Sequence, residues 1–141
     1  MAEVLRRFLG RPRRFDWVEC NCFTFCADWV LEVTGRDPAA QWRGRFSSKA
    51  DAVRLLRLAG GTRALAERAM ASAGAPLTDN PQAGDVVLVL APIGTGAGNK
   101  IIRRPTGAIC VDAEKVALMT GDLGLLIAPL PIVKAWSVGC G

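Results

Sequence analysis

The sequence contains no histidine and no tyrosine. Without histidine, this chain alone cannot form a Ser-His-Asp or Cys-His catalytic arrangement, a His-ligated zinc site or the usual neutral-pH general base. Aromatic residues make up only 6% of the chain, so a base-stacking platform for nucleic acid is not expected. The sequence also has no helix-turn-helix, zinc-finger or RNP-like motif. We therefore do not expect nucleic acid as a partner.

Long apolar segments are missing as well. The longest apolar run, residues 86–93, has eight residues, whereas a membrane-spanning helix needs about 20. Arginines near the N-terminus are not followed by an apolar segment with a small-residue cleavage site, so we expect no signal peptide and no membrane span. A chain of 141 residues that is 50% hydrophobic and 22% charged is expected to form one globular domain.

Cysteine is present in an odd number. The five cysteines are Cys20, Cys22, Cys26, Cys110 and Cys140. Without a secretion signal, a disulfide framework is not expected, and at least one thiol is free. The C-x-C-x3-C spacing has no second pair to complete a zinc ribbon, and an iron–sulfur cluster would need a fourth ligand from Cys110 or Cys140. We predict no cofactor and no metal, with a redox or metal-binding cysteine cluster as the weakest alternative.

The formal net charge of +5 lies entirely in the first half of the chain. Twelve basic and seven acidic residues precede position 64, and the rest of the chain carries six of each. The density is highest in residues 1–14, which we predict to be a basic N-terminal arm. Such a segment either contacts an acidic partner or an anionic polymer, or is simply solvated.

The order of the predicted elements indicates a single α+β domain over residues 1–141. Helices are expected in residues 15–75 and antiparallel strands in residues 84–138, without the alternation that marks a parallel sheet. Expected helices cover residues 3–9, 22–34, 48–59 and 62–73, with Ser48 and Thr62 as N-caps. Expected strands cover residues 86–90, 107–111, 115–119, 123–127 and 133–138, and residues 94–100 are expected to form a flexible loop.

Cys22 is the strongest candidate for chemistry. If Asn21 caps the second helix, Cys22 lies in its first turn, where free backbone N–H groups and the helix dipole favour a thiolate. The alternative is a buried thiol that packs under the sheet. Cys26 lies one turn further along the same face and is expected to belong to the core.

Several short segments resemble the NlpC-type cell-wall cysteine peptidases, most closely a poorly characterised phage and prophage relative of that family. The matching segments are Phe15-Asp16-Trp17, residues 21–30 followed by Thr34-Gly35, residues 82–87, residues 107–111 and residues 135–138. Their order along the chain is that of the family. The resemblance implies a papain-like fold, with N-terminal helices packed on a C-terminal antiparallel sheet and Cys22 at the nucleophile position.

Two residues depart from the pattern of that family. The histidine that activates the cysteine falls at about Thr106, and a threonine hydroxyl cannot accept a thiol proton as a general base. Asn21 stands where the family usually has aspartate. We therefore predict a degenerate, non-catalytic peptidase fold. The resemblance implies a structural component of a phage or prophage tail, at its tip or baseplate. The protein would then lie in the virion, or in the bacterial cytoplasm before assembly, with other tail proteins or peptidoglycan as partners.

The alternative prediction is an active cysteine endopeptidase or amidase that cuts peptidoglycan. In this interpretation Cys22 is the nucleophile, and Asp85, Asp112 or a neighbouring subunit supplies the base. Backbone N–H groups at the start of the cysteine helix would stabilise the oxyanion.

Overall fold

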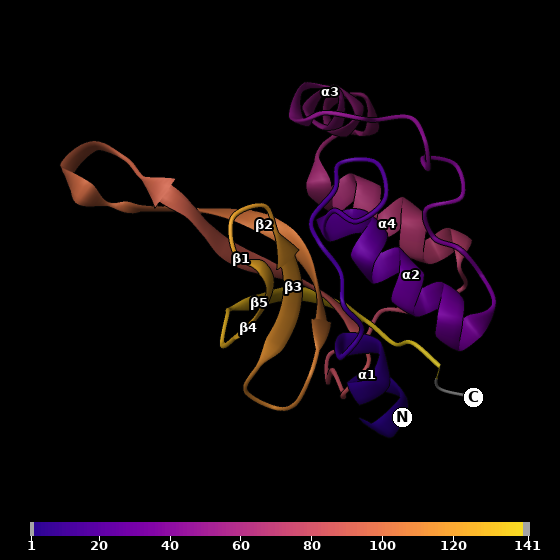
Figure 1. The fold of residues 1–141 in the computed structure, drawn as a ribbon. Coiled ribbons are helices and arrows are strands. Elements are labelled where there is room, and N and C mark those ends of the chain that lie inside the picture. Colours follow the sequence, from indigo (N-terminus) through magenta and orange to yellow (C-terminus); the bar gives the residue numbers. More distant parts are fainter. Residues whose placement is uncertain (1, 140–141) are drawn as a thin grey trace.

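The computed structural model describes residues 2–139, except for the side chain of Ile93. Four helices precede five strands, as Figure 1 shows. The helices are α1 (Ala2–Leu9), α2 (Cys22–Thr34), α3 (Lys49–Ala59) and α4 (Thr62–Ser72). The strands are β1 (Val86–Thr95), β2 (Ile101–Cys110), β3 (Val116–Thr120), β4 (Gly124–Ala128) and β5 (Ile132–Trp136), with a 3-10 turn at Ala97–Asn99. The predicted α+β class is confirmed. None of these helices has the length and hydrophobicity needed to cross a bilayer.

Helix α2 begins and ends where its sequence predicts. The side-chain oxygen of Asn21 accepts hydrogen bonds from the backbone N–H groups of Phe23 and Thr24, and the Thr24 hydroxyl accepts one from the Asn21 N–H. This reciprocal capping box satisfies three backbone donors at the start of the helix. Gly35 ends the helix with φ of 76°, a left-handed conformation that glycine adopts without a steric penalty.

Helices α3 and α4 meet at two glycines, and here one predicted cap is wrong. Ser48 caps α3 as predicted, because its hydroxyl accepts the Asp51 N–H. Thr62 was expected to cap α4, but it is the first helical residue, and the N-cap position is held by Gly61. Gly60 and Gly61 have φ values of 92° and 106°, and these left-handed conformations turn the chain within two residues.

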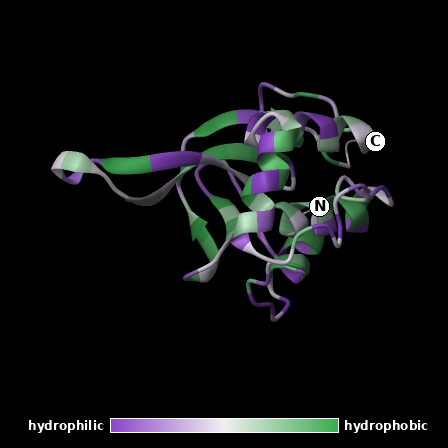
Figure 2. Cartoon of the chain, turned by 90° about the horizontal axis from the view of Figure 1, so that it is seen from above, coloured by the Kyte–Doolittle hydropathy of each residue, from purple (hydrophilic) through white to green (hydrophobic). Residues whose placement is uncertain are grey.

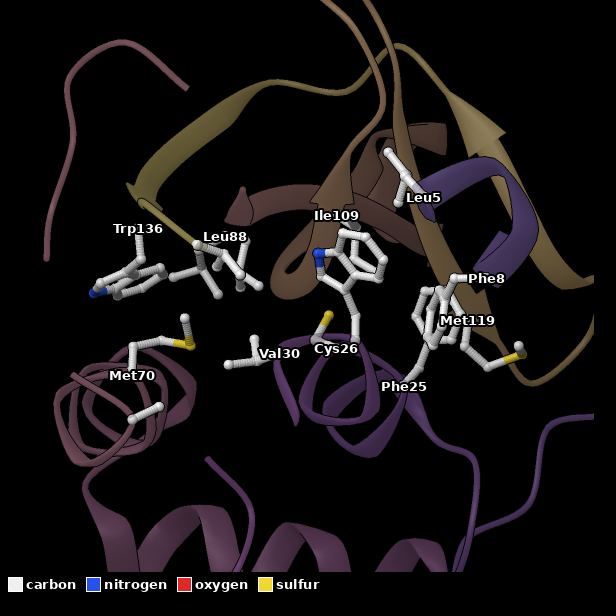
Figure 3. Packing of buried hydrophobic residues seen from close by; sticks show 14 residues of the cluster. Leu5, Phe8, Phe25, Cys26, Val30, Met70, Leu88, Ile109, Met119 and Trp136 are labelled. Atoms are coloured by element: carbon white, nitrogen blue, oxygen red, sulfur yellow. The ribbon is translucent and has the colours of Figure 1, made fainter. Parts of the chain in front are cut away.

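The five strands form one antiparallel sheet in the order β4-β3-β2-β1-β5. Side chains on one face form a core with α1 and α2, which includes the fully buried Phe25 and Trp29 (Figure 3). Side chains on the other face form a second core made of residues from the sheet itself and its loops. Leu126 of β4 and Ala135 of β5 both contribute to this second core. Since these strands are opposite edges of the sheet, the sheet must curl around it.

Strands β1 and β2 extend further than predicted. Their outer parts form a two-stranded arm that projects from the domain (Figures 1 and 2). Strand β3 pairs with β2 only at Ile109 and Cys110, and β5 pairs with β1 only over residues 86–89, so the arm's outer edges have no strand neighbour among the described residues. Pro92 and Pro105 lie in this arm, outside the strands predicted from the sequence. A strand edge without a neighbouring strand tolerates proline, because an N–H group on that edge would make no hydrogen bond in the sheet.

The predicted basic N-terminal arm is partly built into the core. Leu5 and Phe8 of α1 are buried against α2 and the sheet. The Arg13 guanidinium lies 4.3 Å from the centre of the Phe8 ring and donates a hydrogen bond to the Phe8 carbonyl at 2.7 Å. Arg6 and Arg7 remain exposed on the outer side of α1.

The contact between α2 and the start of β1 gives the first testable prediction. The indole N–H of buried Trp29 donates to the Gly84 carbonyl at 2.7 Å. Trp29→Phe leaves that buried acceptor without its donor, so we expect a loss of about 1–3 kcal/mol in the free energy of unfolding, measured by urea denaturation. Trp17→Phe, at a half-buried indole, is the matched control and should cost clearly less. Equal losses in the two variants would contradict this role for Trp29.

Candidate functional site

A cavity of about 350 Å³ lies between the helices and the sheet. Its walls come from the first turns of α2, from α3 and α4, and from β1, β2 and β5. Most wall residues are apolar, including Leu56, Leu65, Ala66, Leu88 and Trp136. Cys22, the predicted nucleophile, borders this cavity and is half-buried. The first turn of the helix that the sequence predicts to begin at Cys22 therefore lies in the wall of this cavity.

The surroundings of Cys22 favour the neutral thiol. Burial raises the pKa of the Cys22 thiol above its ordinary value, although the backbone N–H groups of Phe23 and of Cys22 itself act in the opposite direction. The N–H groups of Phe23 and Thr24 are already bound by Asn21, which weakens their ability to stabilise a thiolate. The structure therefore agrees with the alternative of a buried thiol and not with the expected low-pKa thiolate.

The strand opposite Cys22 presents a glycine. A Cβ atom placed on Gly107 would lie 3.7 Å from the Cys22 carbonyl oxygen and 3.5 Å from the Cys26 sulfur, so Gly107 faces the first turns of α2. Thr106 pairs with Val89, whose side chain belongs to the core on the other face of the sheet. Because cross-strand partners point to the same face, the Thr106 side chain points away from α2.

This alternation separates Thr106, the position predicted for the missing histidine, from the residue of β2 that faces the cysteine turn. Thr106 borders the cavity, but so does Val87, whose side chain also belongs to the opposite core. Gly107 is the position on β2 from which a side chain would reach the cysteine turn. The protein therefore has neither an imidazole nor any other side chain at that place.

The two aspartates considered as bases have structural roles away from the cavity. The buried Asp85 carboxylate accepts hydrogen bonds from the backbone N–H groups of Gln82 and Val138, at 2.8 and 3.0 Å. It thereby joins the start of β1 to the end of the chain. Asp112 lies in an exposed turn, where the N–H groups of Glu114 and Lys115 bind its carboxylate and lower its pKa. Neither aspartate borders the cavity.

Among the other described cysteines, Cys26 lies near Cys22, and a negative charge on Cys22 raises the pKa of the Cys26 thiol. Cys26 is buried and points from α2 toward the sheet (Figure 3), and burial raises the pKa of its thiol well above the ordinary value. Burial also raises the thiol pKa of Cys20 and Cys110. Within residues 2–139, no group of three or more His, Cys, Asp or Glu side chains is arranged to hold a metal ion. Cys140 lies outside the described residues.

No pattern in the sequence indicates the cavity itself. It exists because α4 and β2 present short side chains toward one another, among them Ala66, Ala69 and Gly107. Small residues of this kind are usual in well-packed helices and strands, and only the three-dimensional arrangement shows that the space between them is left open. Two cations, Lys49 on α3 and Arg104 on β2, are the only charged residues that border it in the described part of the chain.

Comparison with known protein families assigns the chain to one of them. A family described as "Domain of unknown function (DUF6950)" matches residues 1–138. The chain belongs to this family. No curated protein and no solved structure gives a significant match. Functional conclusions for this DUF6950 member therefore rest on its own residues and geometry.

The state of Cys22 gives a prediction that can be measured directly. Because burial raises its pKa, alkylation of Cys22 by iodoacetamide should be slow at pH 7 and should still accelerate as the pH rises above 9. The rate is followed by peptide mapping, with buried Cys26 as the internal reference. A reaction that is fast at neutral pH, with a midpoint well below pH 8, would show an activated thiolate and contradict this description.

Proposed function

We propose that this DUF6950 chain is a non-catalytic module with a degenerate NlpC-type, papain-like fold, and that it serves as a structural component of a phage or prophage tail, at the tip or baseplate. The observation that carries the non-catalytic part is the environment of Cys22. Its thiol lies at the head of α2 as in a cysteine peptidase, but burial raises its pKa, and the strand opposite this turn of the helix carries Gly107, which has no side chain.

A cysteine peptidase needs a group that takes the thiol proton. None of the described residues that border the cavity is an aspartate, glutamate or histidine. General-base assistance contributes about 10²- to 10⁴-fold to such reactions, and a thiol with a raised pKa is in addition mostly protonated at neutral pH. Both effects act in the same direction, so hydrolysis at Cys22 would be very slow.

The apolar character of the cavity also argues against a peptidoglycan-cutting site. The sugar and peptide groups of peptidoglycan are polar and need hydrogen-bond partners when they are bound. The cavity offers few such partners, because the amide oxygen of Asn21 is occupied by the helix cap and most other wall residues are apolar. A surface of this kind suits binding of apolar groups.

The tail assignment comes from the sequence resemblance, and features of the surface are compatible with an assembled protein. The arm formed by β1 and β2 carries Lys100, Arg103 and Arg104, and residues 86–110 include no acidic side chain. Ile101 and Ile102 on the same arm are exposed, at 59% and 42%. Exposed apolar residues next to a uniform charge are typical of surfaces that contact an acidic protein partner.

Replacement of Cys22 separates the proposed function from the enzymatic alternative. In the bacterium or prophage that carries this gene, we expect the chain to be found by mass spectrometry in purified tail-containing particles. Cys22→Ala should yield as many infectious particles as the native gene, because the thiol has no chemical role, whereas deletion of the gene should abolish particles.

The purified protein provides the matching control. Neither the native chain nor Cys22→Ala should release soluble fragments from isolated peptidoglycan sacculi. Fragment release by the native chain that Cys22→Ala abolishes would establish the endopeptidase or amidase. Absence of the chain from purified particles would contradict the tail assignment.

A further inference from the structure

We propose that the cavity beside Cys22 binds a single-chain anionic amphiphile, an unbranched alkyl carboxylate, with its hydrocarbon tail inside and its head group at Lys49. The cavity volume of about 350 Å³ lies within the range of small-molecule sites. This inference concerns binding alone and does not depend on whether the protein belongs to a phage tail.

The walls of the cavity define the tail of the ligand. Helices α3 and α4 supply aliphatic side chains, and Leu88 and Trp136 close the sheet side. A peptide main chain in this space would lose the hydrogen bonds that its amide groups make with water, at a cost of about 1–3 kcal/mol for each unsatisfied group. A hydrocarbon chain has no such groups. It gains about 0.8 kcal/mol per buried methylene, so the walls select an alkyl chain.

The rim of the cavity defines the head group. Lys49, the first residue of α3, borders the cavity and is exposed. Arg104 of β2 also borders it, but Arg104 pairs with Ala91, whose side chain belongs to the core on the other face of the sheet, so we assign it no contact with the head group. No acidic side chain borders the cavity among the residues that the structure describes. A carboxylate at the rim meets the Lys49 ammonium while remaining in contact with water, whereas a cationic head group would be repelled.

Helix α3 gives the ligand a way in. Its apolar residues Ala52, Val53, Leu55 and Leu56 face the cavity but are only partly buried, and Ala59 is its single buried residue. A helix with so few fully buried side chains has little packing energy to lose when it shifts. Insertion of an alkyl chain would complete the burial of this apolar face, so the ligand and α3 should stabilise one another.

Two ligands that share a tail and differ in head charge test the proposal. Dodecanoate, kept below the concentration at which it forms micelles, should bind the full-length protein in a saturable 1:1 manner by isothermal titration calorimetry. Trp17 and Trp136 border the cavity, so their fluorescence provides a second readout. Dodecyltrimethylammonium should bind at least about tenfold more weakly, because its head is cationic.

Matched variants locate the site. Ala66→Phe puts a ring into the cavity and should abolish binding, whereas Ala71→Phe, the same change on the exposed side of α4, should leave it intact. Lys49→Gln should weaken dodecanoate binding by roughly two- to fivefold without affecting the cationic amphiphile in the same direction. Arg57→Gln, an exposed position on the same helix that does not border the cavity, is the charge control.

Several results would overturn the proposal. These are a lack of saturable dodecanoate binding, equal affinity for both head groups, equal effects of Ala66→Phe and Ala71→Phe, and binding that requires anionic lipid vesicles instead of the free chain. Circular dichroism of Ala66→Phe shows whether it folds. If it does not, Val53→Phe on the facing helix replaces it. Dodecanoate binding is measured on the purified chain without particles or sacculi, so failure here leaves the proposed function untouched, and failure of the latter leaves this site untouched.

Discussion

The close packing of α2 on β2 determines the character of the whole site. Gly107 allows this approach, since even a Cβ atom there would already be in van der Waals contact with the Cys26 sulfur and the Cys22 carbonyl oxygen. On the far side of α2, the Trp29 indole holds the helix to the Gly84 carbonyl at the start of β1. The cavity that Cys22 borders has no acidic side chain among the described residues, and the nearby Cys26 is itself a buried thiol with a raised pKa.

Two opposing effects act on the Cys22 thiol, and their balance decides what it can do. The start of a helix stabilises a nearby negative charge by about 0.3–1 kcal/mol at an exposed position. Burial penalises the thiolate, and here it is the larger effect, because the net direction of the pKa change is upward. In an active cysteine peptidase an imidazolium next to the sulfur reverses this balance. This chain has no histidine, so its own residues supply no imidazolium that could do so.

Much of the fold could be predicted from the sequence because its signals are local. Asn21, Gly35 and Ser48 mark helix boundaries through hydrogen bonds and backbone conformations within a few residues, and these predictions are confirmed. Non-local features could not be found in this way. The outer parts of β1 and β2 are strands because they pair with one another around Pro92 and Pro105, which a single-strand pattern interprets as breaks. The face on which Thr106 lies depends on its pairing with Val89, a register that no local motif shows.

The most direct measurement of the central claim is the reactivity of Cys22 after a histidine has been placed on either face of β2. Gly107→His puts an imidazole on the face that meets α2, and Thr106→His puts the same group one residue away on the opposite face. The account predicts that Gly107→His lowers the pKa of Cys22 and accelerates its alkylation at pH 7 by at least about tenfold, while Thr106→His leaves the rate unchanged. Acceleration by Thr106→His alone, or rapid alkylation of the unmodified protein at pH 7, would contradict the account.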